Sequence, residues 1–226
     1  MDLQTFSRAF TKVRSQGWVK SKRKGDTGVG HTLEHYLGIA ENNFSLADLG
    51  GAELKAKREG ASSLITLFTR DRKAWKVRQS DAIRDFGSID DDGRQNLYCT
   101  LFANARGNRF KMKVTTDGVF VEHRTGTVLC EWKYDDLAAC FTKKFPALML
   151  VAAKSDSRTD GEWFKYKSAK LLSGSSPTKF RNCLASGLIS IDLRLYLVGK
   201  KVRNHGTAFR ISEDSLPRLF STQRAF

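Results

Sequence analysis

The stretch of sequence that decides the fold is residues 47–55, which read Ala-Asp-Leu-Gly-Gly-Ala-Glu-Leu-Lys. Its second half predicts a short strand over residues 52–57. Side chains of a strand alternate between its two faces, so Glu53 and Lys55 project together while Leu54 points into the core. We therefore predict a carboxylate and an ammonium side by side at the start of this strand.

Asp48 stands shortly before Glu53, and the glycines between them can fold it back beside the strand. Two carboxylates placed in this way can share one Mg²⁺ ion, which proteins hold through one or two carboxylates, water and substrate oxygens. Such a site suits phosphodiester hydrolysis, with Lys55 orienting or deprotonating the attacking water and offsetting charge on the phosphorus. Glu34, on a preceding predicted helix, could add a third carboxylate. The alternative is a solvated ion pair on an edge strand, which contributes less than about 1 kcal/mol.

The charge balance points to a polyanionic partner. The chain has 39 Lys and Arg against 24 Asp and Glu, a formal net charge of +15. Each phosphate that a basic side chain neutralises releases a condensed counterion, which favours binding to nucleic acids. Basic and acidic residues interleave along the chain, which indicates a folded basic surface and not a disordered arm. A basic protein unrelated to nucleic acids is the alternative.

Other classes of protein fit the sequence poorly. The longest nearly uninterrupted apolar run, residues 145–153, is far shorter than the roughly 20 residues of a membrane span. Residues 1–10 lack the apolar stretch of a secretory signal. The four cysteines contain no CxxC pair and read as free thiols in a reducing compartment, and the four histidines lack zinc-ligand spacing. We therefore expect a cytoplasmic protein.

The order of predicted elements favours an α/β or α+β fold with a central mixed sheet flanked by helices. The length fits one domain, residues 1–226, with a division into two lobes left open. Strands 52–57 and 63–69 are expected to pair through a turn near Glu59 and Gly60, while residues 163–172 read as mixed. The predicted helices are residues 3–16, 32–40, 81–86, 135–144 and 179–186. The further predicted strands are residues 97–103, 110–115, 119–123, 127–132, 147–153, 190–198 and 207–211.

Four motifs, in order, resemble those of the MvaI/BcnI-like restriction endonucleases. They are residues 22–34 (KRKGDTGVGHTLE), 47–55 (ADLGGAELK), 63–69 (SLITLFT) and 205–211 (HGTAFRI). The resemblance runs from about residue 17 to residue 211, with a looser middle. One position departs from the family pattern: Ala47 stands where the motif typically has Pro. That Pro shapes the turn and carries no chemistry.

The resemblance implies a PD-(D/E)xK nuclease fold related to the mismatch-repair nickase MutH. Whether the fold forms two lobes around a DNA cleft stays an open alternative. It implies Glu34, Asp48, Glu53 and Lys55 as the catalytic set, with the three carboxylates holding Mg²⁺, for which Mn²⁺ substitutes. The catalytic part would lie mainly in residues 1–70, and DNA recognition mainly in residues 70–96 and 179–211.

The implied activity is cleavage of double-stranded DNA at a short G/C-rich, near-palindromic site. A monomer would nick the two strands in sequence, and a companion DNA methyltransferase would act on the same site. Two alternatives stay open: a repair nickase of the MutH type, and a non-catalytic DNA-binding module. The second predicts a broken catalytic set, and all four positions are intact in this sequence.

Candidates for reading bases lie late in the chain. Asp192 and Arg194 share one face of the strand at residues 190–198, where Arg194 could bind guanine bidentately and Asp192 accept from a cytosine amino group. The alternative is an Asp–Arg pair that links side chains on an exposed sheet face. The resemblance favours base reading, because these enzymes read C·G pairs with residues of this region. His205 and Arg210, in the last motif, are further candidates.

Candidates for phosphate contacts precede a helix start near Thr27. Lys22, Arg23 and Lys24 stand there, where the free N–H groups of a helix end favour an anion. A solvated basic loop is the alternative. The remaining candidates for contacts with DNA are Arg78, Arg84, Lys200 and Arg203.

Overall fold

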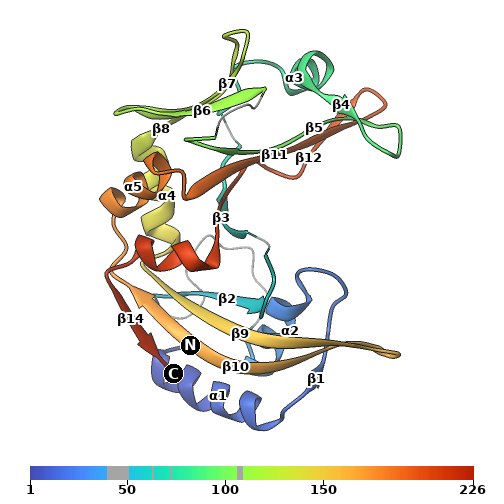
Figure 1. Ribbon diagram of the computed structural model, residues 1–226. Coiled ribbons are helices and arrows are strands. Elements are labelled where there is room, and N and C mark those ends of the chain that lie inside the picture. Colours follow the sequence, from blue (N-terminus) through green and yellow to red (C-terminus); the bar gives the residue numbers. More distant parts are fainter. Residues whose placement is uncertain (40–50, 63, 72, 106–108) are drawn as a thin grey trace. The chain divides into compact units, whose positions relative to one another are not determined.

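The computed structural model describes residues 1–39, 51–62, 64–71, 73–105 and 109–226. They form two compact units (Figure 1). Unit 1 comprises Met1–Ser62, Thr142–Ser175 and Phe220–Phe226, and unit 2 comprises Ser63–Phe141 and Ser176–Leu219. Each unit is therefore assembled from segments that lie far apart in the sequence.

The described part of unit 1 contains a five-stranded sheet and two complete helices. Its sheet has the order β1-β10-β9-β2, with β14 also paired to β10. Strand β2 runs parallel to β9, and the other pairs are antiparallel, so this sheet is mixed. The elements are α1 (Leu3–Ser15), β1 (Val19–Lys20), α2 (Gly28–Leu37), β2 (Glu53–Arg58), β9 (Ala147–Arg158), β10 (Gly161–Ser173) and β14 (Thr222–Ala225).

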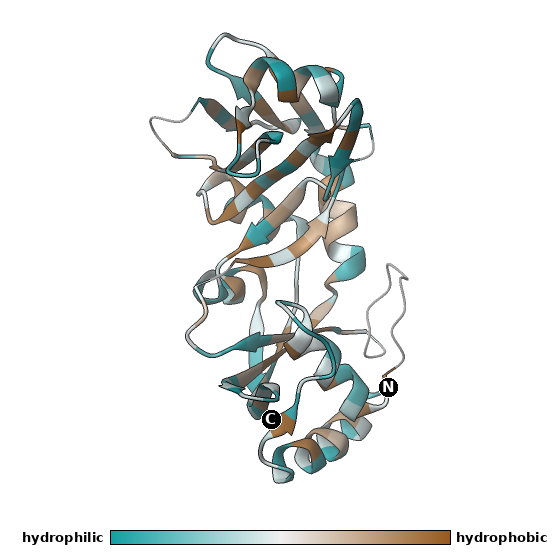
Figure 2. Ribbon diagram, turned by 90° about the vertical axis from the view of Figure 1, so that its right-hand side faces the viewer, coloured by the Kyte–Doolittle hydropathy of each residue, from teal (hydrophilic) through white to brown (hydrophobic). Residues whose placement is uncertain are grey.

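Helix α1 forms because its apolar residues recur at helical spacing and its N-terminus is capped. Phe6, Phe10 and Val13 are buried, and the Asp2 side chain accepts a hydrogen bond of 2.8 Å from the Thr5 N–H. Figure 2 shows apolar and polar residues alternating along this helix. The buried face packs with residues of α2, β2, β9 and β10 into the core of unit 1.

Unit 2 contains two antiparallel sheets. The larger has the order β3-β13-β11-β5-β4, with β12 paired to β11, and the smaller has the order β6-β7-β8. Helix α4 (Tyr134–Lys144) begins in unit 2 and ends in unit 1. The other elements are β3 (Ile65–Thr69), α3 (Gln79–Phe86), β4 (Ser88–Ile89), β5 (Gln95–Phe102), β6 (Phe110–Val114), β7 (Gly118–His123), β8 (Val128–Lys133), α5 (Pro177–Ala185), β11 (Ile189–Val198), β12 (Lys201–Asn204), β13 (Ala208–Ile211) and the 3₁₀ helix η1 (Glu213–Leu219).

Strand β11 separates the core of unit 2 from a polar sheet face. Ile191, Leu193 and Leu195 are fully buried, while Asp192 and Arg194 project from the opposite face. On the core side, aromatic rings of distant segments stack, with centroids 5.0 Å apart for Phe68 and Phe209 and 4.8 Å apart for Phe141 and Phe180. The core thus fixes which side chains of β11 remain available on the other face.

The predicted hairpin of residues 52–57 and 63–69 is wrong. Strand β2 pairs in parallel with β9, with Glu53 opposite Leu148, whereas β3 pairs with β13 in unit 2. The turn residue Gly60 is present with a φ of +76°, but the apolar side chains of each strand are buried by partners from later in the sequence. Long-range packing therefore overrides the local hairpin signal.

Two other predictions need correction. The helix expected at residues 32–40 begins earlier, at Gly28, because burial of Val29 offsets the low helix propensity of two glycines in its first turn. Residues 163–172, which read as mixed, lie within the long strand β10. In the described part of the chain, every helix is too short or too polar to cross a lipid bilayer.

Candidate active site

The Glu53 carboxylate lies at the start of β2 with only 6% of the residue exposed. Its Oε1 atom is 3.4 Å from Lys55 Nζ and 3.5 Å from Lys144 Nζ. The Lys55 ammonium also lies 5.8 Å from the centroid of the Phe145 ring. A buried carboxylate keeps its charge when cations compensate it, and here two ammonium groups do so. Among the described residues, this cluster brings one buried carboxylate and two ammonium groups together at the start of β2.

Lys144 is a residue that reasoning from the sequence missed. It ends α4 and precedes β9, the parallel neighbour of β2. A parallel pair needs a long crossover connection, and the first segment of unit 2, Ser63–Phe141, lies between Glu53 and Lys144 in the sequence. Its position at the end of a predicted helix was its only sequence signal, and that signal says nothing about Glu53.

Of the other two predicted catalytic carboxylates, the structure describes Glu34 but not Asp48. Glu34 lies half-buried on α2, which packs through Leu33 and Leu37 against a core that includes Leu54 of β2. Asp48 lies outside the described residues. Among the residues that are described, no three His, Cys, Asp or Glu side chains gather as a metal site. The three-carboxylate set thus stays a prediction.

The basic loop, residues 20–27, leads into α2. Thr27 is the N-cap residue of α2, close to the predicted helix start. The Lys22 N–H donates to Thr32 Oγ1 at 2.9 Å, which ties the loop to the helix that follows. A Cβ on Gly28 would lie 2.5 Å from the Arg23 carbonyl oxygen, so the close approach there requires glycine. Lys22 and Lys24 are exposed and Arg23 is half-buried.

A buried carboxylate connects two of the predicted base-reading arginines. Asp192 is 1% exposed, and its Oδ2 accepts from Arg210 Nη1 at 2.7 Å and from Arg194 Nη2 at 3.4 Å. Arg210 Nη2 also donates to the Leu64 carbonyl at 2.6 Å. The Arg194 side chain remains 40% exposed. The Asp–Arg pair weighed as the alternative to base reading therefore exists, and it leaves the Arg194 guanidinium accessible.

Two tyrosines, Tyr98 and Tyr196, lie near Arg194 on the same sheet face, and reasoning from the sequence did not single them out. The Arg194 guanidinium lies 5.7 Å from the centroid of the Tyr98 ring, and the Arg94 guanidinium 5.1 Å from that of Tyr196. Tyr196 also stacks with His205, whose ring centroid is 5.7 Å away. Cation–π contacts restrict where a guanidinium can point. The sequence Arg194-Leu195-Tyr196, which puts an arginine and a tyrosine on one face of β11, is the signal that could have revealed Tyr196.

The His-Gly-Thr turn of the last motif contacts Thr69 and Asp71, which belong to the same unit. Gly206 has a φ of +90°, and a Cβ there would lie 3.1 Å from the Thr69 side chain. Thr207 Oγ1 donates to Asp71 Oδ1 at 3.0 Å, and Trp75 Nε1 donates to the same oxygen at 2.6 Å. Asp71 is thus a further residue that sequence reasoning missed, and it fixes the turn on which His205 is exposed.

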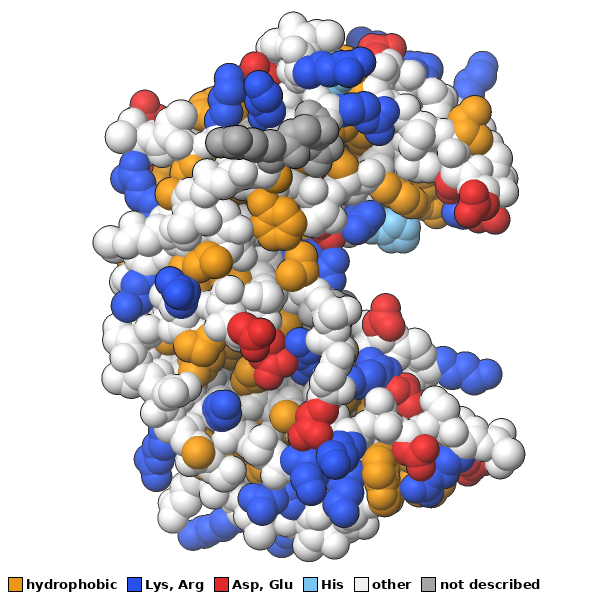
Figure 3. All heavy atoms as spheres, in the orientation of Figure 1, with side chains coloured by type: hydrophobic (Ala, Val, Ile, Leu, Met, Phe, Trp, Pro, Cys, Tyr) orange, Lys and Arg blue, Asp and Glu red, His pale blue; other side chains and the backbone are white. Residues whose placement is uncertain are grey.

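The remaining predicted contacts are solvent-exposed. Arg84 forms an ion pair of 2.5 Å with Asp81, which lowers the pKa of that carboxyl. Figure 3 shows Lys and Arg side chains on the displayed face of both units, with acidic side chains among them. Arg78, Lys200 and Arg203 are also exposed.

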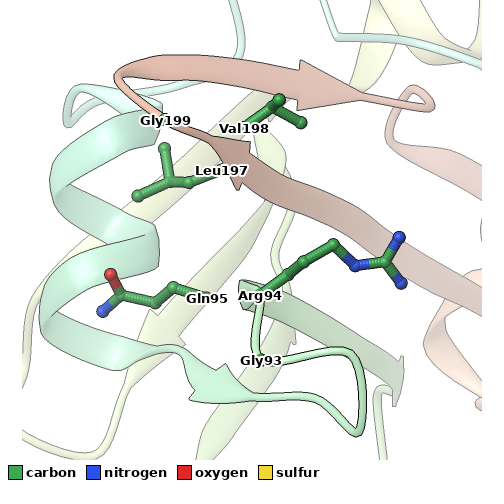
Figure 4. A pocket seen from close by; sticks show the side chains of 6 residues that line it. All are labelled: Gly93, Arg94, Gln95, Leu197, Val198 and Gly199. Atoms are coloured by element: carbon green, nitrogen blue, oxygen red, sulfur yellow. The ribbon is translucent and has the colours of Figure 1, made fainter.

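An open pocket of about 420 Å³ lies at the β4–β5 and β11–β12 turns (Figure 4). It is lined by Gly93, Arg94, Gln95, Leu197, Val198 and Gly199. Asp90 and Asp92 hold the Arg94 guanidinium at 3.0 and 2.7 Å, and Gln95 Nε2 donates to the Arg84 carbonyl. None of the predicted site residues lines this pocket, although Arg94, which does line it, also stacks on Tyr196 of the polar sheet face.

Comparison with known proteins places the chain in a family. The model of the MvaI/BcnI restriction endonuclease family matches residues 8–220. The structure of restriction endonuclease MvaI in complex with its cognate DNA substrate is similar, with 27% identity, a TM-score of 0.81, and coverage of 100% of this chain and 99% of that one. The structure of MvaI in the absence of DNA matches with 26% identity, a TM-score of 0.54, and coverage of 99% and 96%. No curated protein sequence matches the chain. The chain therefore belongs to the MvaI/BcnI restriction endonuclease family and is a type II restriction-endonuclease-like nuclease with a PD-(D/E)xK-type fold.

Proposed function

We propose that this nuclease uses Mg²⁺ to hydrolyse phosphodiester bonds of duplex DNA at a short G/C-rich, near-palindromic site. The observation that carries the proposal is the buried carboxylate of Glu53. It lies in the segment that carries the nuclease motif, between the ammonium groups of Lys55 from the same strand and Lys144 from the end of α4. The similarity to MvaI, a structure of which contains its cognate DNA substrate, supports duplex DNA as the substrate.

The donor chemistry at Glu53 fits a divalent cation. A carboxylate oxygen is the ligand that Mg²⁺ prefers, and burial on β2 fixes its position. Asp48 and Glu34 are the further ligands that we propose, and Mn²⁺ should substitute for Mg²⁺. When bound, the metal supplies charge stabilisation at the phosphate and a water molecule of lowered pKa.

The lysines of the cluster have distinct roles in this proposal. Lys55 lies on the same face of β2 as Glu53 and orients the attacking water or takes part in its deprotonation. Lys144 adds a second positive charge from the end of α4, which offsets charge on the phosphate. The Phe145 ring beside Lys55 limits access of bulk water to that ammonium.

The polar face of the larger sheet in unit 2 is the proposed base-reading surface. Arg194 binds guanine through its exposed guanidinium, and the buried Asp192 holds Arg194 and Arg210 in place. Asp192 Oδ1 is buried and lacks a hydrogen-bond partner in the described structure, and we propose that it accepts from a cytosine amino group once the Arg194 side chain moves onto the DNA. The proposed phosphate and groove contacts are Lys22, Arg23, Lys24, Arg78, Arg84, Lys200, Arg203 and His205.

A single catalytic set in one chain cuts one strand at a time. We propose that a monomer nicks one strand, reorients and nicks the other, and that a companion methyltransferase protects the same site. The proposed division places catalysis mainly in residues 1–70 and recognition mainly in residues 70–96 and 179–211.

Cleavage of a supercoiled plasmid by the purified protein tests the proposal. The reaction is run with Mg²⁺, with Mg²⁺ and a chelator, and with the Glu53→Ala variant. Discrete linear fragments that need both the metal and Glu53 support a site-specific endonuclease, and the sequenced ends give the site. Nicked circles alone would favour a nickase of the MutH type. Salt-sensitive binding without any cutting would leave a DNA-binding module.

A further inference from the structure

Arg58, the last residue of β2, makes a set of contacts that the proposed chemistry does not use. Its Nε and Nη2 atoms donate to the two carboxylate oxygens of Glu162, on β10, at 2.6 and 2.7 Å. The guanidinium also lies 5.2 Å from the centroid of the Phe164 ring. The side chains of Arg58 and Glu162 are 21% and 25% exposed, and the carboxylate raises the pKa of the guanidinium. This bidentate, stacked arrangement fixes the plane of the guanidinium.

The outer edge of the same guanidinium holds the basic loop. Arg58 Nη1 donates to the Asp26 carbonyl and Nη2 to the Gly25 carbonyl, each at 3.0 Å. At the other end of the loop, the Ser21 N–H donates to the main-chain carbonyl of Glu162 at 2.8 Å. The loop is therefore anchored at both ends. The Arg58 guanidinium holds Gly25 and Asp26, the main chain of Glu162 holds Ser21, and the three basic residues lie between these points.

The geometry also reaches α2. The Gly28 N–H donates to the Gly25 carbonyl at 3.0 Å, so that carbonyl joins the first turn of α2 to Arg58. Glu34 lies on this helix and Glu53 at the opposite end of the strand that Arg58 terminates. One guanidinium thus connects the strand of Glu53 and Lys55 to both the loop and the helix.

We propose that Arg58, held by Glu162, is a positioning residue that sets Lys22, Arg23 and Lys24 for contact with DNA phosphates. This inference rests on the proposed binding of duplex DNA. Arg58 acts through the loop and does not touch the substrate itself. Lysine cannot replace it, because a single ammonium cannot donate in one plane to a carboxylate and to two carbonyl groups at once.

Arg158 provides a matched control in the same sheet. It is paired to Asp156 at 2.9 Å on β9, is more exposed, and stacks on Trp18 and Trp163 instead of holding the basic loop. Arg58→Lys and Arg158→Lys both keep the net charge, so the two variants differ mainly in what the lost guanidinium held.

The test measures the affinity for a DNA duplex over a series of salt concentrations, with a chelator present so that no cleavage occurs. Each phosphate contact contributes a slope of about 0.9 in log K against log [salt]. We expect Arg58→Lys to reduce the magnitude of this slope toward that of the Lys22→Ala/Arg23→Ala/Lys24→Ala variant. For three lost contacts the reduction is up to about 2.7. Adding Arg58→Lys to that triple variant should lower the affinity less than twofold further. Arg158→Lys should keep the slope of the unaltered protein.

The outcomes separate the two levels of the argument. If the unaltered protein shows no salt-dependent binding, the proposed function itself fails. If it binds but Arg58→Lys keeps its slope, or if the losses of affinity add in the combined variant, the positioning role is overturned. Glu162→Gln gives a second measure, because it removes the charge that orients Arg58, and we expect a smaller fall of the slope. Circular dichroism and the melting temperature establish that each variant compared is folded.

Discussion

The two lysines at Glu53 compete with any cation that binds the same carboxylate oxygen. Replacing Lys144 by Gln removes one competitor and keeps Lys55. At 3.5 Å, the Lys144–Glu53 attraction is about 1 kcal/mol for the dielectric constant of water and about 5 kcal/mol for an effective value of 20. Lys144 is one-third exposed, so a value near the lower limit, about 1 to 1.4 kcal/mol, applies. We therefore expect Lys144→Gln to bind a divalent cation about 5- to 10-fold more tightly.

Titration calorimetry with Mn²⁺, in the absence of DNA, measures this affinity directly. Lys143→Gln is the matched control, because Lys143 is the exposed neighbour on the same helix and the charge change is identical. Its effect should stay below about twofold, since solvent and salt screen a distant exposed charge. Equal effects of the two substitutions would mean that only the overall field matters. An unchanged affinity in Lys144→Gln would refute competition at Glu53.

Three further outcomes are expected. Glu53→Ala or Lys55→Ala should lower the cleavage rate by about a thousandfold or more, because each removes a group at the reacting phosphate, while DNA affinity measured with a chelator changes only a few-fold. Loss of binding in step with loss of cutting would contradict these roles. Arg194→Ala should lower discrimination at one base pair by about 1 to 3 kcal/mol, measured as the ratio of kcat/KM for the cognate and singly substituted sites, and an unchanged ratio would remove Arg194 from the reading set. Burial raises the pKa of the Cys99 thiol to about 12, so its thiolate at pH 8 is about a thousandth of the ordinary amount. Cys99 is partly exposed, so its alkylation, followed by mass spectrometry, reports the pKa: it should be slow in the native protein and fast in urea, and rapid native labelling would contradict the raised pKa.

Much of the secondary structure could be predicted from the sequence, because helices and strands have characteristic periods of apolar residues. Phe6, Phe10 and Val13 predicted α1 almost to its ends, and the alternation around Leu193 predicted β11. The same alternation put Glu53 and Lys55 on one face of β2, where the structure has them. The hairpin expected from the turn at Gly60 failed, because a turn signal says nothing about which partner buries each strand.

The candidate site divides along the same line. Motif and spacing within a few residues were enough to select Glu53 with Lys55, and Asp192 with Arg194, as pairs, because neighbouring residues on a strand have their faces determined by the backbone alone. The catalytic set with Glu34 and Asp48 still rests on the family pattern.

By itself, the sequence determined the basic character of the protein, its family, and the side-chain faces of the strands that carry the motifs. Tertiary structure alone decided that Lys144 meets Glu53, that Arg58 and Glu162 hold the basic loop, and that Asp192 is buried beneath two arginines. These contacts join segments that are distant in the sequence. Their geometry depends on how the strands order themselves within each sheet, which is set by burial of whole apolar faces and leaves no short-range trace in the sequence.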